Sequence, residues 1–189
     1  FAPDNPLAMM ATGFLGAGKT TFIDGITGFT PIAAGRVTFD GQDLEGLTPD
    51  RRAHLGMSRT FQSLELFEDL TVRDNLFAAA ERPKWHSFLR DIIQPGANER
   101  QYVTQVEWAL ELLDLADHAD ALPADISHGQ RKLVGVARAL AARPRLVLLD
   151  EPAAGLDTAE SQHLGQQMRG LLDEDISVFL IDHDMGLVL

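Results

Sequence analysis

Short apolar runs near both ends of the chain alternate with segments of helical periodicity. Residues 6–12 form an apolar run that leads into a glycine-rich loop, and a helical pattern then continues through Ile26. Near the other end, "RLVLLD" (145–150) and "ISVFLIDH" (176–183) are predominantly apolar runs, which are typical of parallel strands buried on both faces. A helix is predicted between them, over 157–172. The alternation predicts an α/β fold with a mostly parallel sheet.

The middle of the chain follows other patterns. Residues 35–44 alternate like a strand that ends at an Asp-Gly turn, and residues 49–57 resemble a short helix. Helical patterns then dominate, although 81–98 contains two prolines and a glycine and is predicted to be irregular. The predicted helices are 71–80, 99–116 and a third that follows Gly129. We therefore expect a core built from 1–63 and 143–189, interrupted by a helical subdomain at 64–142.

Composition restricts the possible functions. The 189 residues are 45% hydrophobic and 23% charged, which is typical of a globular protein, and the length suffices for one sizeable α/β domain or for one domain with a smaller lobe. The net charge of -12, without a run of Lys or Arg, argues against general nucleic-acid binding. The sequence contains no cysteine, so zinc–thiolate sites and cysteine nucleophiles are excluded. No apolar run approaches the roughly 20 residues that span a bilayer.

The glycine-rich loop carries the strongest chemical signal. Gly13, Gly18, Lys19 and Thr20 fit the phosphate-loop pattern G-x-x-x-x-G-K-[ST]. Glycines let successive backbone N–H groups face one anion at the start of a helix. Lys19 would then contact the β- and γ-phosphates, and the hydroxyl of Thr20 would bind Mg2+. Because the motif follows a predicted strand and opens a predicted helix, it indicates a nucleoside-triphosphate site.

Two acidic residues complete the requirements of such a site. Asp150 ends the apolar run "LVLLD" and Glu151 follows it directly. The first carboxylate can orient the Mg2+ shell, and the second, on the other side of the pleat, can polarise an attacking water. The alternative, a merely polar strand end before a turn, is disfavoured by the phosphate loop.

Ser127 and His128 could be read as a nucleophile and its base. No G-x-S-x-G elbow surrounds Ser127, because position 125 is Asp. A histidine adjacent in sequence would not normally face its neighbour's hydroxyl. The pair therefore does not indicate a serine hydrolase.

The order of five motifs resembles the ATP-binding subunit of an ABC transporter. The motifs span most of the chain: "GFLGAGKTT" (13–21), "TFQS" (60–63), "ISHGQRKL" (126–133), "LVLLDEPAAGLD" (146–157) and "LIDHD" (180–184). The resemblance implies a phosphate-loop NTPase core with a helical subdomain that carries the signature motif "ISHGQ". It also implies that the sequence is incomplete at both ends.

Roles for individual residues follow from this resemblance. ATP would be held by the loop residues Gly13, Gly16, Ala17, Gly18, Lys19, Thr20 and Thr21. Thr20 and Asp150 would bind Mg2+, and Gln62 would sense both this ion and the γ-phosphate. Glu151 would be the general base, and His183 would contact the γ-phosphate. Ser127, Gly129 and Gln130 would reach ATP bound to the opposite subunit, and Asp157 would lie at the subunit interface.

The resemblance also implies partners and a substrate class. Residues 26–76, "DEPAAGLD" and "IDHDMGLV" are similar to the branched-chain amino-acid importers, whereas the histidine in "SHGQ" is similar to urea-type importers. The expected function is ATP-driven import of branched-chain or related amino acids through a permease. The chain itself would act at the cytoplasmic face of the membrane. The partners would be a second ATPase subunit, identical or a sister, and an extracytoplasmic solute-binding protein. A urea or amide importer and a non-transport ABC ATPase stay open as alternatives.

Replacement of Lys19 tests the phosphate-loop assignment. Lys19→Ala should weaken ATP binding by roughly 10- to 100-fold, because a charge-assisted contact to the phosphates is lost. A nucleotide titration checks this, and unchanged affinity would sink the assignment.

Overall fold

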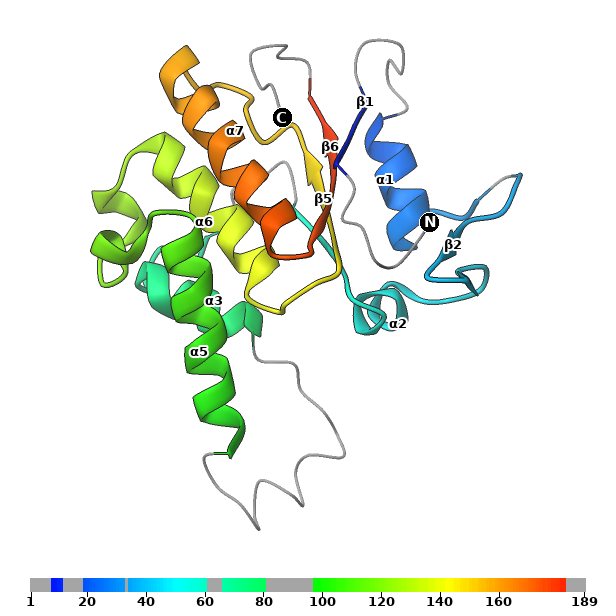
Figure 1. Cartoon of the computed structure of the whole chain (residues 1–189), viewed down its shortest axis with the longest axis horizontal. Coiled ribbons are helices and arrows are strands. Elements are labelled where there is room, and N and C mark those ends of the chain that lie inside the picture. The colour runs from blue at the N-terminus through cyan, green and yellow to red at the C-terminus, as the bar shows by residue number, and fades with distance from the viewer. Residues whose placement is uncertain (1–7, 12–18, 33, 61–65, 81–96, 183–189) are drawn as a thin grey trace. The chain divides into compact units, whose positions relative to one another are not determined.

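A computed structural model of the chain describes residues 8–11, 19–32, 34–60, 66–80 and 97–182. The chain divides into two compact units. The first comprises Phe1–Gln62 and Pro144–Leu189, and the second comprises Ser63–Arg143. In the described part of the chain the first unit holds a parallel sheet, and the second is helical (Figure 1).

The sheet of the first unit has four strands among the described residues. Its order is β1 (Ala8–Ala11), β6 (Ser177–Ile181), β5 (Leu146–Asp150) and β4 (Met57–Arg59). Every neighbouring pair is parallel. The helices α1 (Lys19–Thr27) and α7 (Thr158–Asp173) lie on opposite faces of the sheet (Figure 1), which explains the unbroken apolar character of β5. The predicted α/β fold with a mostly parallel sheet is confirmed.

The segment 35–44, predicted as a strand that ends at an Asp-Gly turn, is a small hairpin around that turn. Strands β2 (Thr38–Phe39) and β3 (Gln42–Asp43) pair antiparallel around Asp40 and Gly41. Both turn residues have positive φ, 51° and 75°, which is the conformation that a tight hairpin turn requires. Arg145 Nη1 donates to Asp40 Oδ2 at 2.5 Å, and this hydrogen bond lowers the pKa of the Asp40 carboxyl.

The short helix predicted over 49–57 ends earlier than expected. It is α2 (Pro49–His54), with Thr48 as N-cap and Pro49 in the first turn. The chain turns at Gly56, whose φ is 99°, and enters β4. The sequence gives no strand signal for β4, because three residues are too few to show a period. Its pairing with β5 creates the strand.

Two arginines fix helix α1, which follows the phosphate loop. Arg52 is buried, and its Nη1 donates to the carbonyls of Gly25 and Ile26 at 2.7 Å each. These carbonyls belong to the last turn of α1, where a positive charge is favoured. Arg59 at the end of β4 pairs with Asp24 of α1 at 2.5 Å. The helix is thus held from both α2 and β4.

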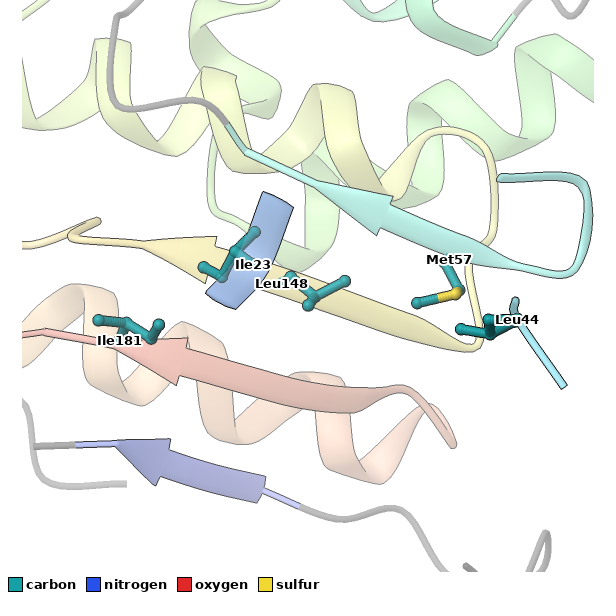
Figure 2. Close-up of a cluster of buried hydrophobic side chains, with 5 residues drawn as sticks. All are labelled: Ile23, Leu44, Met57, Leu148 and Ile181. Carbon is teal, nitrogen blue, oxygen red and sulfur yellow. The ribbon is translucent and has the colours of Figure 1, made fainter. Parts of the chain in front are cut away.

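A cluster of buried apolar side chains joins α1 to the sheet. It comprises Ile23 from α1, Leu148 from β5, Ile181 from β6, Met57 from β4 and Leu44 (Figure 2). Each is at most 3% exposed. The cluster fixes the height of α1 above the sheet.

Among its described residues, the second unit packs three α-helices together. They are α3 (Val72–Ala80), α5 (Ala97–Leu112) and α6 (His128–Leu140), with the short 3-10 turns η1 (Ala116–His118) and η2 (Pro123–Asp125) between α5 and α6. Helix α3 packs against both α5 and α6. The fully buried side chains Leu76, Leu110 and Val134 lie one on each helix.

A buried asparagine shapes the start of the second unit. The side chain of Asn75 is fully buried, and its Oδ1 accepts the N–H of Phe67 at 2.9 Å. Its Nδ2 donates to the carbonyls of Phe67 and Thr71 at 3.0 Å each. Asn75 thereby ties the segment 67–71 to the first turn of α3.

Truncation of a core side chain should destabilise the first unit. Leu148→Ala is expected to lower the free energy of unfolding by about 2–5 kcal/mol, because it leaves a cavity between α1 and the sheet. Leu122→Ala, at a side chain that is 40% exposed, is the matched control and should change it far less. Denaturant unfolding measures both, and equal losses would contradict the packing in Figure 2.

Candidate functional site

The register of the parallel sheet places three chain segments side by side. Ala11 at the end of β1 and Asp150 at the end of β5 both pair with Ile181 at the end of β6. Neighbouring strands lie about 4.8 Å apart, so the three ends span roughly 10 Å along one edge. Ligands of open α/β sheets bind outside this carboxyl edge.

Several predicted site residues follow these strand ends but lie outside the described residues. They are Gly13, Gly16, Ala17 and Gly18 after β1, Gln62 after β4, and His183 after β6. Two residues before Gln62, Thr60 donates its N–H to the carbonyl of Leu148 at 2.9 Å, so the chain is still bound to β5 at that point. Helix α1 begins at Lys19 and includes Thr20, and Thr21 is exposed in its first turn.

Asp150 is the buried carboxylate of this edge. It is the last residue of β5 and is 3% exposed. A carboxylate this buried must be compensated by a cation or by hydrogen-bond donors. Its hard oxygen atoms are the ligand type that Mg2+ prefers, and the donor chemistry therefore fits that ion.

Glu151 leaves the strand in an unusual conformation. Its φ is 50°, in the left-handed region that few residues other than glycine adopt. The N–H of Glu151 donates to the carbonyl of Ile181 at 2.7 Å, and its carbonyl accepts the N–H of Ala154 at 3.2 Å. We expected the pleat of β5 to direct Glu151 to the opposite side from Asp150. This prediction is wrong, because Glu151 lies past β5 in a tight turn. Such strain is concentrated at functional sites.

Asp182 is a further residue of this edge, and the sequence did not indicate its role. It is 2% exposed, and its Oδ2 accepts the N–H of the buried Ala153 at 3.0 Å. The bond joins the turn after Glu151 to the chain directly before His183. The available signal was an acidic residue directly after an apolar strand, but its partner could not be read from the sequence.

Asp157 caps helix α7. Its Oδ1 accepts the N–H of Glu160 at 2.8 Å, and Glu160 Oε2 accepts the N–H of Asp157 at 3.2 Å. This reciprocal capping box ends the turn that begins at Glu151. Asp157 is exposed.

The remaining predicted residues lie together at the start of α6, in the second unit. Ser127 is the N-cap, and its Oγ accepts the N–H of Gln130 at 3.1 Å. Gln130 Oε1 accepts the N–H of Ser127 at 2.8 Å, which completes a second capping box. Gly129 is buried in the first turn, whereas Ser127 is exposed. A helix start of this kind presents N–H groups that favour an anion.

Along the chain a strand is followed by a phosphate-loop sequence and a helix, and an acidic strand end lies two strands away in the sheet. This arrangement defines a phosphate-loop nucleotide-binding protein. Residues 8–154 match the family described as "ABC transporter". The chain belongs to this family. It is an ABC ATPase of a transporter, which binds and hydrolyses ATP. No helix among the described residues is long and apolar enough to span a membrane.

Proteins that are similar to this chain in sequence are named as ATP-binding proteins of transport systems. The chain is 36% identical, over 178 residues, to the "High-affinity branched-chain amino acid transport ATP-binding protein BraF" of Pseudomonas aeruginosa. That match covers 92% of this chain and 70% of the relative. It is 35% identical to the "Spermidine/putrescine import ATP-binding protein PotA" of Chromobacterium violaceum, over 90% of this chain and 44% of the relative.

A solved structure shares the fold. The "ADP conformation of MJ1267, an ATP-binding cassette of an ABC transporter" superposes with a TM-score of 0.78 at 29% sequence identity. The match covers 97% of this chain and 72% of that one. The expected ABC ATPase fold is therefore confirmed.

The strained conformation of Glu151 has a measurable consequence. Glu151→Gly should raise the free energy of unfolding by about 1 kcal/mol, because glycine adopts positive φ without a steric penalty. Glu151→Gln keeps the side-chain size and the backbone strain, and should leave stability near that of the unchanged chain. If both variants unfold at the same denaturant concentration, Glu151 is not strained.

Proposed function

We propose that the chain powers the import of branched-chain or related amino acids through a membrane permease. The observation that carries the proposal is the similarity to BraF over 92% of the chain, together with the expectation from residues 26–76. The similarity to PotA covers 44% of that relative and favours a shared ATPase more than a shared solute. Import of urea or amides is the alternative that the histidine of "SHGQ" suggests.

The two units have different tasks in this proposal. Residues 1–63 and 143–189 form the nucleotide-binding core, and residues 64–142 form a helical subdomain that presents the signature motif. The compact units, which divide after Gln62 and before Pro144, support this assignment. A parallel sheet in one and packed helices in the other fit the two tasks.

ATP is held at the carboxyl edge of the sheet. The residues that bind its phosphates are Gly13, Gly16, Ala17, Gly18, Lys19, Thr20 and Thr21. Thr20, Gln62 and Asp150 would hold Mg2+, which supplies positive charge to the phosphates. The common register of Ala11, Ile181 and Asp150 supports this arrangement, because it brings the loops after three strands to one edge.

Glu151 acts as the general base and His183 orients the γ-phosphate. Phosphoryl transfer needs positioning and charge stabilisation more than covalent chemistry. The hydrogen bonds that fix Glu151 on Ile181, and Asp182 on Ala153, supply such positioning. In the sequence the base follows β5 and His183 follows β6, and the pairing of these two strands supports the proposal that both act at one edge.

A second subunit completes the site. Ser127 and Gly129 contact the γ-phosphate of ATP on the partner, Gln130 belongs to the same ATP-binding helix start, and Asp157 lies at the subunit interface. The capping box that orders the start of α6 supports the anion-binding role. The partner is a second copy or a sister subunit. The dimer acts at the cytoplasmic face of the membrane with permease subunits and, indirectly, an extracytoplasmic solute-binding protein.

Replacement of the base tests the catalytic assignment. Glu151→Gln should reduce steady-state hydrolysis by at least about 100-fold and accumulate an ATP-bound dimer, because water is no longer activated while the phosphates still bind. Phosphate release and size-exclusion chromatography with ATP measure the two effects. Glu111→Gln, at an exposed position of α5, is the control. Turnover near that of the unchanged chain would show that Glu151 is not the base.

Reconstitution tests the substrate. The chain, assembled with its cognate permease and solute-binding protein, should raise uptake of labelled leucine, isoleucine or valine. Glu151→Gln in the same assembly should abolish that uptake. Uptake of urea or of spermidine alone would replace the proposed substrate class with the corresponding alternative.

A further inference from the structure

We propose that His118 is a positioning residue for the signature motif. Through the side chain of Gln130, it fixes the orientation of Ser127 at the start of α6. The inference rests on the proposed function, in which Ser127 and Gly129 contact the γ-phosphate on the partner. His118 lies outside the five motifs that carry the family resemblance.

A chain of hydrogen bonds links the three side chains. Gln130 Nε2 lies 2.6 Å from His118 Nε2. On its other side, Gln130 Oε1 accepts the N–H of Ser127 at 2.8 Å. The backbone N–H of Gln130 donates back to Ser127 Oγ at 3.1 Å. Gln130 is therefore bound at both ends of its amide.

The chemistry of the amide gives these bonds a direction. The N–H of Ser127 can only donate, so the amide oxygen of Gln130 must face it. The amide nitrogen then faces His118 and donates, which makes His118 Nε2 the acceptor. The imidazole must consequently carry its proton on Nδ1. If His118 offered no acceptor, the amide of Gln130 would lose the contact that holds its nitrogen away from Ser127.

The backbone of His118 is fixed independently of its side chain. Its N–H donates to the carbonyl of Leu115, and its carbonyl accepts the N–H of Ala121, both at 3.0 Å. The adjacent segment is bound to the first turn of α3, where Val72 and Arg73 donate their N–H groups to the carbonyls of Ala121 and Ala119. Replacement of the imidazole should therefore leave η1 in place.

The burial of these side chains decides what the contact between His118 and Gln130 affects. His118 and Gln130 are both half-buried, whereas Ser127 is exposed. Water can satisfy the groups of Ser127, but it does not fix their direction. Loss of the acceptor would thus affect the orientation of Ser127 more than the stability of the fold. Orientation is the property on which the rate of phosphoryl transfer depends.

The experiment compares His118→Leu with His118→Gln in the assembled transporter. His118→Leu removes the acceptor, and we expect kcat for ATP hydrolysis to fall about tenfold. ATP affinity of the isolated chain, which depends on the phosphate loop, should stay within about twofold, as should the denaturant midpoint. His118→Gln provides a carbonyl oxygen at similar reach, and it should restore most of kcat. Equal losses in the two variants, or a kcat for His118→Leu near that of the unchanged chain, would overturn the proposal.

Ser127→Ala in the same assay separates this inference from the function on which it rests. A loss of kcat with Ser127→Ala but not with His118→Leu would overturn the role of His118 alone. If Ser127→Ala has no effect, the proposed role of the start of α6 fails, whatever His118→Leu does. Nitrogen-15 NMR of the histidine rings at about pH 8, where imidazole is ordinarily neutral, gives a direct readout. We expect the Nδ1–H tautomer for His118, and an Nε2–H tautomer would contradict the hydrogen-bond direction.

Discussion

The parallel pairing of β1, β6 and β5 is the constraint on which the candidate site depends. Ala11 and Asp150 share Ile181 as their register partner, so the segments that follow three strands leave one edge in a row. Each segment carries a different group: the phosphate loop, the two carboxylates, and the histidine after β6. Parallel strands end on the same side of a sheet, so this register supports the proposal that residues far apart in sequence bind one nucleotide.

Polar contacts fix helix α1 and the turn after Glu151 near that edge. Arg52 and Arg59 bind α1 from α2 and β4, so the helix behind the phosphate loop cannot shift without breaking contacts to Gly25, Ile26 and Asp24. Asp182 performs the same task for the turn after Glu151 by binding Ala153. These partners are buried or half-buried, and so the bonds are costly to break. Rigid support of this kind allows the strained backbone of Glu151 to persist.

In the second unit, polar groups that are buried or half-buried fix the segments that connect the helices. Asn75 fixes the chain that enters α3, and backbone bonds from Val72 and Arg73 fix the segment after His118. The amide of Gln130 then orients Ser127. Each of these links is specific in direction, because an amide or an imidazole has one donor face and one acceptor face. Apolar packing of the three helices alone would leave the direction of Ser127 open.

The sequence by itself determined the alternation of strands and helices and the start of α6, and it predicted the phosphate loop, because these depend on local periodicity and on short motifs. It also placed Asp150 at the end of a buried strand and Glu151 directly after it. It could not find β4, whose three residues become a strand only by pairing with β5, nor β3, which pairs with β2 after the predicted Asp-Gly turn. Only the tertiary structure decided the strand order, the positive φ of Glu151 and the partners of Asp182 and Gln130. The physical reason is that these features arise from contacts between residues distant in sequence, which no local pattern records.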